Sequence, residues 1–135
     1  MTSFGFGTTI AATYDQAVEL TRTALKEQGF GVLTEIDVRQ TLQEKLGADF
    51  RPYVILGACN PALAHRALAA NLDVGLLLPC NVVVYDNGDG TSRVEAMDPG
   101  AALGLVGDDL VVAAVASEAE LLLRTAINNV AKLGA

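Results

Sequence analysis

The apolar residues of this chain follow the two-residue repeat of a strand in some segments and the helical repeat in others. Residues 4–12 are rich in Phe, Thr and Ile and predict a first strand, in which Gly5 and Gly7 indicate a bulge. Thr13 then opens a helix, because Gln16 stands three residues later, as a capping box requires. The helical stripe consists of Tyr14, Ala17, Val18, Thr21, Ala24, Leu25 and Gln28.

A strand with one apolar and one polar face is predicted after Gly29, which closes that helix. Residues 32–38 change character at every second position, and we expect the apolar face to join the core. A short helix follows over residues 39–47, with Gly47 as its stop. The two faces of the strand carry Val32, Thr34, Ile36 and Val38 on one side and Leu33, Glu35 and Asp37 on the other.

Capping signals mark two more helices. Residues 53–58 form a buried strand in this interpretation, and the Asn-Pro pair at residues 60–61 starts a helix over residues 61–70. Asparagine accepts a hydrogen bond from a free amide there, and proline has no amide to lose. One of the two aspartates at residues 108–109 caps a last helix that runs to about residue 133.

A hairpin is predicted between these two helices. The second half of residues 74–86 and the segment at residues 91–98 form its strands, joined by the NGDG turn at residues 87–90. Residues 99–107 are rich in glycine and are expected to be a loop.

The predicted order is strand, helix, strand, short helix, strand, helix, two-stranded hairpin and helix, without an internal repeat. Helices on one face of a mainly antiparallel sheet give an α+β two-layer sandwich. We expect one domain over residues 1–135. The second face of the sheet must be polar or covered by another subunit, and the many Val and Leu residues favour a homodimer.

Composition and charge argue against some classes of binding partner. The chain is 51% hydrophobic and 19% charged, with a net charge of -7. Its nine basic residues are scattered, which argues against binding to nucleic acid or to an anionic membrane surface. The amino terminus does not resemble a secretory signal, and the longest apolar run, residues 110–116, is too short to cross a bilayer. We therefore expect an acidic cytoplasmic protein whose two cysteines remain thiols.

Four blocks of the sequence resemble the signature blocks of the domain-of-unknown-function family 302. The blocks are GFGVLTEIDV at residues 29–38, KLG at 45–47, YVILGACNPALAHRAL at 53–68 and GLLLPCNVVVYD at 75–86. The resemblance implies a compact homodimer, similar in fold to one repeat of the TATA-box-binding protein. That fold is β-α-β4-α with helices on one face, and the helix after the third strand would be an extra element. The resemblance implies neither DNA binding, since the basic sheet surface is missing, nor a reaction.

Both cysteines are followed by asparagine at the edge of an apolar strand. Cys59 directly precedes a helix cap, where the helix dipole favours a thiolate and therefore redox or sulfur chemistry. The alternative is that Cys59 is a small hydrophobe that closes a strand. Cys80 can pair with Cys59 only if the two strand ends meet in the fold.

Other polar residues near these strands have one structural and one functional interpretation each. In the structural interpretation Asn60 caps a helix and Asn81 ties a loop to the end of a strand. In the functional interpretation their side-chain amides orient a ligand or hold an oxyanion. Glu35 and Asp37 either face solvent or a dimer interface, or act as acid and base or hard-metal ligands. His65, the only histidine, lies on the helix surface or binds zinc or haem iron together with a cysteine.

The sequence favours a homodimeric small-ligand-binding or accessory protein over an enzyme, and it assigns no catalytic residue. A thiol-dependent redox or sulfur-transfer protein is the first alternative, with Cys59 as nucleophile and Cys80 as resolving thiol. A metal or haem protein that uses His65 or the cysteines is the second, and neither a cofactor nor a metal is identified. The candidate ligand site consists of Cys59, Asn60, Cys80 and Asn81, with Glu35 nearby.

Overall fold

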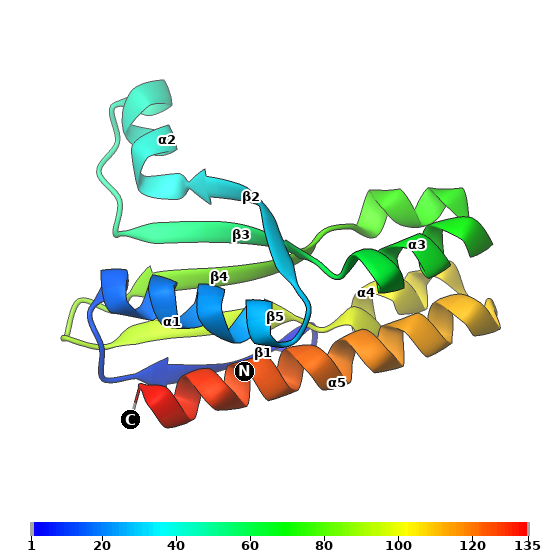
Figure 1. Ribbon diagram of the computed structural model, residues 1–135. Helices are drawn as coiled ribbons and strands as arrows, with labels where there is room; N and C mark the ends of the chain where they lie inside the picture. The colour runs from blue at the N-terminus through cyan, green and yellow to red at the C-terminus, as the bar shows by residue number, and fades with distance from the viewer. Residues whose placement is uncertain (1, 135) are drawn as a thin grey trace.

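Five strands form one antiparallel sheet in the computed structural model, which describes residues 2–134 (Figure 1). The strands are β1 (Gly5–Ile10), β2 (Gly31–Asp37), β3 (Tyr53–Cys59), β4 (Cys80–Asp86) and β5 (Ser92–Met97). Their order across the sheet is β1-β5-β4-β3-β2, and every neighbouring pair is antiparallel. The predicted α+β class is therefore confirmed.

Two long helices cover one face of the sheet, while the others lie at its edge and end (Figure 1). The helices are α1 (Tyr14–Glu27), α2 (Val38–Leu46), α3 (Pro61–Ala70), α4 (Pro99–Leu103) and α5 (Leu110–Leu133), with 3₁₀ helices η1 (Leu72–Leu77) and η2 (Gly104–Val106). The covering helices are α1 and α5, and α2 projects from the β2 edge. Within residues 2–134 no helix combines the length and the apolar character that a membrane crossing requires.

The capping signals in the sequence start helices where they were predicted. The Thr13 hydroxyl accepts a hydrogen bond from the Gln16 amide at 3.2 Å, and the Gln16 side chain accepts one from the Thr13 amide at 3.1 Å. The Asn60 side chain accepts from the Leu63 amide at 3.3 Å. Asp109 accepts from the first amides of α5 in the same way. These local hydrogen bonds need only neighbouring residues, so sequence alone predicts them.

Burial alternates along most of the three central strands. In β3, β4 and β5 the side chains that face α1 and α5 are buried, except Asp86 at the end of β4. Those on the opposite face are half-buried or exposed, except Gly57. The buried set consists of Val54, Leu56, Ala58, Cys80, Val82, Val84, Ser92, Val94 and Ala96. The other face carries the stacked rings of Tyr53 and Tyr85, 5.2 Å apart, with Ile55 and Val83. This second face is the one that the sequence predicted to be polar or covered.

The prediction that β2 has one buried apolar face is wrong. The pairing of β2 with β3 shifts between Val32 and Thr34, so this strand contains a β-bulge. Before the bulge Val32 pairs with a core position of β3, and after it Ile36 pairs with Ile55 on the open face. An extra residue reverses the alternation of side chains, which the two-residue repeat could not anticipate. Consequently Ile36 is 48% exposed and Leu33 is 67% exposed.

The bulge predicted at Gly5 and Gly7 is also wrong. The pairing of β1 with β5 runs without interruption from Gly5 to Ile10. Gly7 instead permits close approach of the neighbouring strand, since a Cβ there would collide with the Val94 carbonyl and with Glu95. In this strand glycine is required by packing and not by backbone irregularity.

Residues 99–106 are helical and do not form the predicted loop. Asp98 accepts a hydrogen bond from the Gly100 amide at 2.8 Å, and Pro99 occupies the first position of α4. The burial of Leu103, which is 4% exposed, anchors this short helix in a second apolar cluster separate from the sheet core. This second cluster consists of Leu63, Ala67, Val74, Leu103, Val112, Val115, Ala116 and Ala119.

Candidate functional site

The two cysteines lie on one small cavity where the sheet core meets the second cluster. Phe30, Ala58 and Cys80 border it from the sheet core, and Leu63 and Leu103 border it from the second cluster. The cavity volume is about 20 Å³, which is room for about one water molecule. Its full lining consists of Phe30, Ala58, Cys59, Asn60, Leu63, Ala64, Ala67, Leu78, Cys80, Leu103, Val115 and Ala119.

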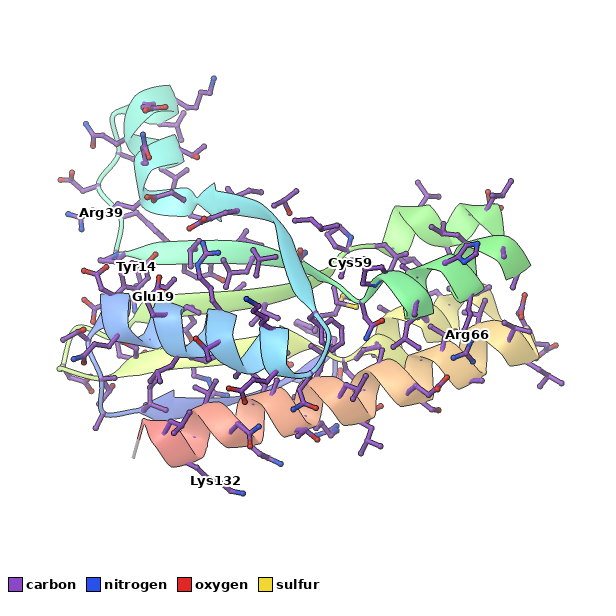
Figure 2. All side chains as sticks on the ribbon, in the orientation of Figure 1. Tyr14, Glu19, Arg39, Cys59, Arg66 and Lys132 are labelled. Carbon is purple, nitrogen blue, oxygen red and sulfur yellow. The ribbon has the colours of Figure 1, made fainter. Side chains whose placement is uncertain are left out.

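Strand pairing and a helix cap bring these residues together. Ala58 is the direct partner of Cys80 across β3 and β4, so the end of β3 lies beside the start of β4. Cys59 is the last residue of β3, and the labelled side chain lies at the junction of the sheet with α3 (Figure 2). Asn60 then turns the chain into α3. The strand ends thus meet, which was the geometric condition for any shared role of the two thiols.

Both thiols are held in their neutral form. Burial raises the pKa of the Cys59 thiol above its ordinary value. For Cys80 burial, together with the nearby Cys59, raises the pKa to about 11. A helix N-terminus alone would favour a thiolate at Cys59, but loss of solvent outweighs that effect here. At neutral pH the cavity therefore presents two weak S–H donors and not a nucleophile.

Asn60 is the lining residue that carries a side-chain amide. Its side-chain oxygen is occupied by the Leu63 amide as the cap of α3. The other end of the side chain is an NH₂ group with two N–H donors. Apart from this amide and the thiols, aliphatic and aromatic side chains dominate the lining. Such a site suits a small uncharged group with one hydrogen-bond acceptor.

The other two candidate site residues lie elsewhere. Asn81 is exposed and points to the opposite face of the sheet from Cys80, because successive residues of a strand alternate. Glu35 pairs with Leu56 across β2 and β3 and forms an ion pair with Arg22 of α1. Neither residue lines the cavity. Three of the four residues in the two Cys-Asn pairs therefore line the cavity, and the fourth, Asn81, lies on the other face of the sheet.

The residues considered as metal ligands are also dispersed. Asp37 caps α2 by accepting from the Gln40 amide at 2.9 Å. His65 is exposed on α3 and does not line the cavity. In the part of the chain that the structure describes, no three His, Cys, Asp or Glu side chains group in a way that could hold a metal ion.

One titratable residue near the β2 edge was not singled out in the sequence. Burial, followed by the charges of Asp37, Glu35 and Asp15, raises the pKa of Tyr14 to about 12. Tyr14 and Arg39 lie toward the same end of the molecule (Figure 2), on a surface cavity of about 420 Å³. No sequence signal links Tyr14 to Asp37, because only the packing of α1 beside β2 brings these distant residues together.

Comparison with known proteins gives a family but no activity. The model of the domain of unknown function DUF302 matches residues 6–130. A crystal structure of an uncharacterized conserved DUF302 protein from Bacillus stearothermophilus is similar to this fold with a TM-score of 0.85 and 35% sequence identity. The similarity covers 95% of this chain and 98% of that chain. No curated protein matches this chain. The chain belongs to the DUF302 family.

Proposed function

We propose that this protein is a homodimeric binding or accessory protein of the cytoplasm, and that its ligand site is the cavity beside Cys59, Asn60 and Cys80. The observation that carries the proposal is the convergence of these three residues on one mostly apolar cavity. The thiols of Cys59 and Cys80 are neutral, so their chemistry supports binding rather than nucleophilic catalysis. Asn81 and Glu35 take no part in this site.

The cavity volume limits the ligand. A volume of about 20 Å³ accepts one small uncharged group, whereas drug-sized ligands need several hundred Å³. A larger molecule would have to move α3 and α4 away from the sheet. The second cluster joins α3 and α4 to the first half of α5, and the second half of α5 packs in the sheet core, so such a movement would also disturb the second cluster or bend α5.

Titration with a small neutral probe tests the ligand site. We expect methanol, which is not much larger than water and carries an acceptor oxygen, to cause saturable shifts in the amide NMR signals of Cys59, Asn60 and Cys80. Ala64→Leu fills the cavity wall and should abolish the shifts, and Ala62→Leu, on the exposed side of the same helix, should preserve them. Shifts that rise linearly without saturation, or that survive in Ala64→Leu, would disprove the site.

The edge of the sheet supports the proposed homodimer. An edge strand offers unpaired backbone groups to another chain, and β2 is such an edge. Ile36 and Leu33 of β2 are exposed, and α2, which follows directly, buries none of its residues. Leu46, the last residue of α2, is 74% exposed, and Phe50, which follows this helix, is 41% exposed. A second copy would cover this apolar edge, and no other occupant is needed.

A thiol redox function is the alternative for the same residues. The proximity of Cys59 to Cys80 favours it, since the charge of one thiolate influences the pKa of the other. The raised pKa values work against it, because the attacking species is the thiolate. The rate of thiol alkylation distinguishes the two functions, as described in the Discussion.

A further inference from the structure

Five large apolar side chains are exposed on η1, η2 and the first turn of α5. The start of α5 lies with α3 and α4 at one end of the molecule (Figure 1). Their exposed fractions range from 47% for Val111 to 87% for Leu76. Exposed apolar groups scattered singly over a surface are normal, whereas a group of them indicates an interaction site. This surface, which we call the apolar tip, consists of Leu72, Leu76, Leu105, Leu110 and Val111.

The residues of the apolar tip are close in sequence to three buried residues of the second cluster. Val74, Leu103 and Val112 are buried together in that cluster, on η1, α4 and α5 respectively. Each of them has an exposed apolar residue within two positions along the chain. These exposed neighbours are Leu72 and Leu76 beside Val74, Leu105 beside Leu103, and Leu110 and Val111 beside Val112. Packing of the three buried residues therefore holds the exposed ones around one small core.

The charge around the apolar tip is negative. Asp73, Asp108 and Asp109 are interspersed among its apolar residues. The sequence contains no Lys or Arg in residues 67–92 or 94–123, which include η1, α4, η2 and the first half of α5. The preceding cation, Arg66 of α3, forms an ion pair with Glu118. Nearby carboxylates thus outnumber cations at this end.

We propose that the apolar tip binds a basic amphipathic helix of a partner protein. An amphipathic helix presents an apolar stripe to the leucines and lysine or arginine side chains to the carboxylates. The tip of a second copy is a poorer occupant, because it would bring two sets of the same carboxylates together. The negative potential of an anionic membrane opposes docking there in the same way. The five residues of the apolar tip do not line the cysteine cavity.

Binding of a synthetic peptide to the full-length protein tests the proposal. The probe is a labelled 18-residue helical peptide with leucines on one face and lysines on the other, and the readout is fluorescence anisotropy. We expect saturable binding that weakens at high salt. The double variant Leu76→Gln/Leu110→Gln should bind at least about tenfold more weakly, since two anchoring side chains are lost. Asp73→Asn/Asp108→Asn should weaken binding and reduce its salt dependence, and it leaves the α5 cap Asp109 in place.

Matched controls distinguish this interaction from non-specific hydrophobic binding. Leu121→Gln changes another exposed leucine of α5, 68% exposed and outside the apolar tip, and should bind the peptide as the unchanged protein does. A peptide with glutamate in place of lysine should not bind. Equal binding of both peptides, or no loss in Leu76→Gln/Leu110→Gln, would overturn the proposal. Tip-dependent binding to vesicles of neutral lipid, or tip-dependent self-association without peptide binding, would also overturn it.

Discussion

The side chain of Thr34 in β2 occupies the space that a side chain on Gly57 of β3 would need. These residues are direct partners just after the β-bulge, and a Cβ on Gly57 would overlap Oγ1 of Thr34 and lie 2.9 Å from Cγ of Pro79. Glycine at this position therefore lets the bulged edge strand close against β3 beside the start of β4. The close approach fixes the strand end on which the cysteine cavity is built.

Gly57→Ala is expected to destabilise the protein by about 1–3 kcal/mol, because the added methyl group overpacks this contact. Adding Thr34→Ala should recover part of the loss. Gly104→Ala is the matched control, since Gly104 has ordinary helical dihedrals and no atom within 4 Å of an added Cβ. Urea unfolding measures all three variants. Equal stability of Gly57→Ala and Gly104→Ala would contradict the packing described.

Folding stability is expected to fall at alkaline pH through Cys80. Its pKa is raised from 9.0 to about 11 by burial, so the folded state favours the protonated thiol. This contribution is fully present below pH 9 and is lost as the pH rises towards 11, up to about 3 kcal/mol. Tyr14, raised from 10.0 to about 12, adds a loss between pH 10 and 12.

Unfolding free energies measured from pH 8 to 11 check this pH dependence. Cys80→Ala should reduce the slope between pH 9 and 11, and Tyr14→Phe should reduce only the slope above pH 10. A Cys80→Ala protein with an unchanged slope would show that the Cys80 thiol is not the group that titrates.

Alkylation by iodoacetamide at pH 7.5 is expected to be slow at both cysteines. A rise of two pKa units leaves Cys80 with about a hundredfold less thiolate than a free cysteine. Cys59 is only partly buried and should react faster than Cys80, yet more slowly than glutathione. Mass spectrometry of tryptic peptides assigns each rate. A Cys59 that outpaces glutathione would favour the thiol redox function over simple binding.

Self-association is expected to depend on the β2 edge. Ile36→Asp and Leu46→Asp place a charge on the exposed residues of β2 and α2, so each should shift the equilibrium from dimer towards monomer, with about tenfold weaker association. Light scattering coupled to size-exclusion chromatography gives the mass of each variant. Leu121→Asp, on the distant α5 surface, should leave the mass unchanged. A monomeric unchanged protein, or a dimer indifferent to both edge variants, would refute this interface.

Local signals in the sequence determined most of the elements. The capping box at Thr13, the asparagine cap at residue 60 and the NGDG turn act through neighbouring residues, and each one lies where the sequence predicted it. The stripe of α1 buries Ala17, Thr21, Ala24 and Leu25 as its helical spacing predicted. The helical repeat of apolar residues and the capping residues are enough to predict these elements, because the interactions span at most one helical turn.

Only the tertiary structure decided which side chains meet. One inserted residue in β2 turned Ile36 to the open face, and strand alternation sent Asn81 away from Cys80 although the two are adjacent in sequence. Pairing between distant strands brought Cys59 to Cys80, and packing of α1 beside β2 raised the pKa of Tyr14. These outcomes depend on register and on desolvation by residues far away in the chain. The local pattern of apolar and polar positions specifies neither the register between distant strands nor the desolvation of a side chain.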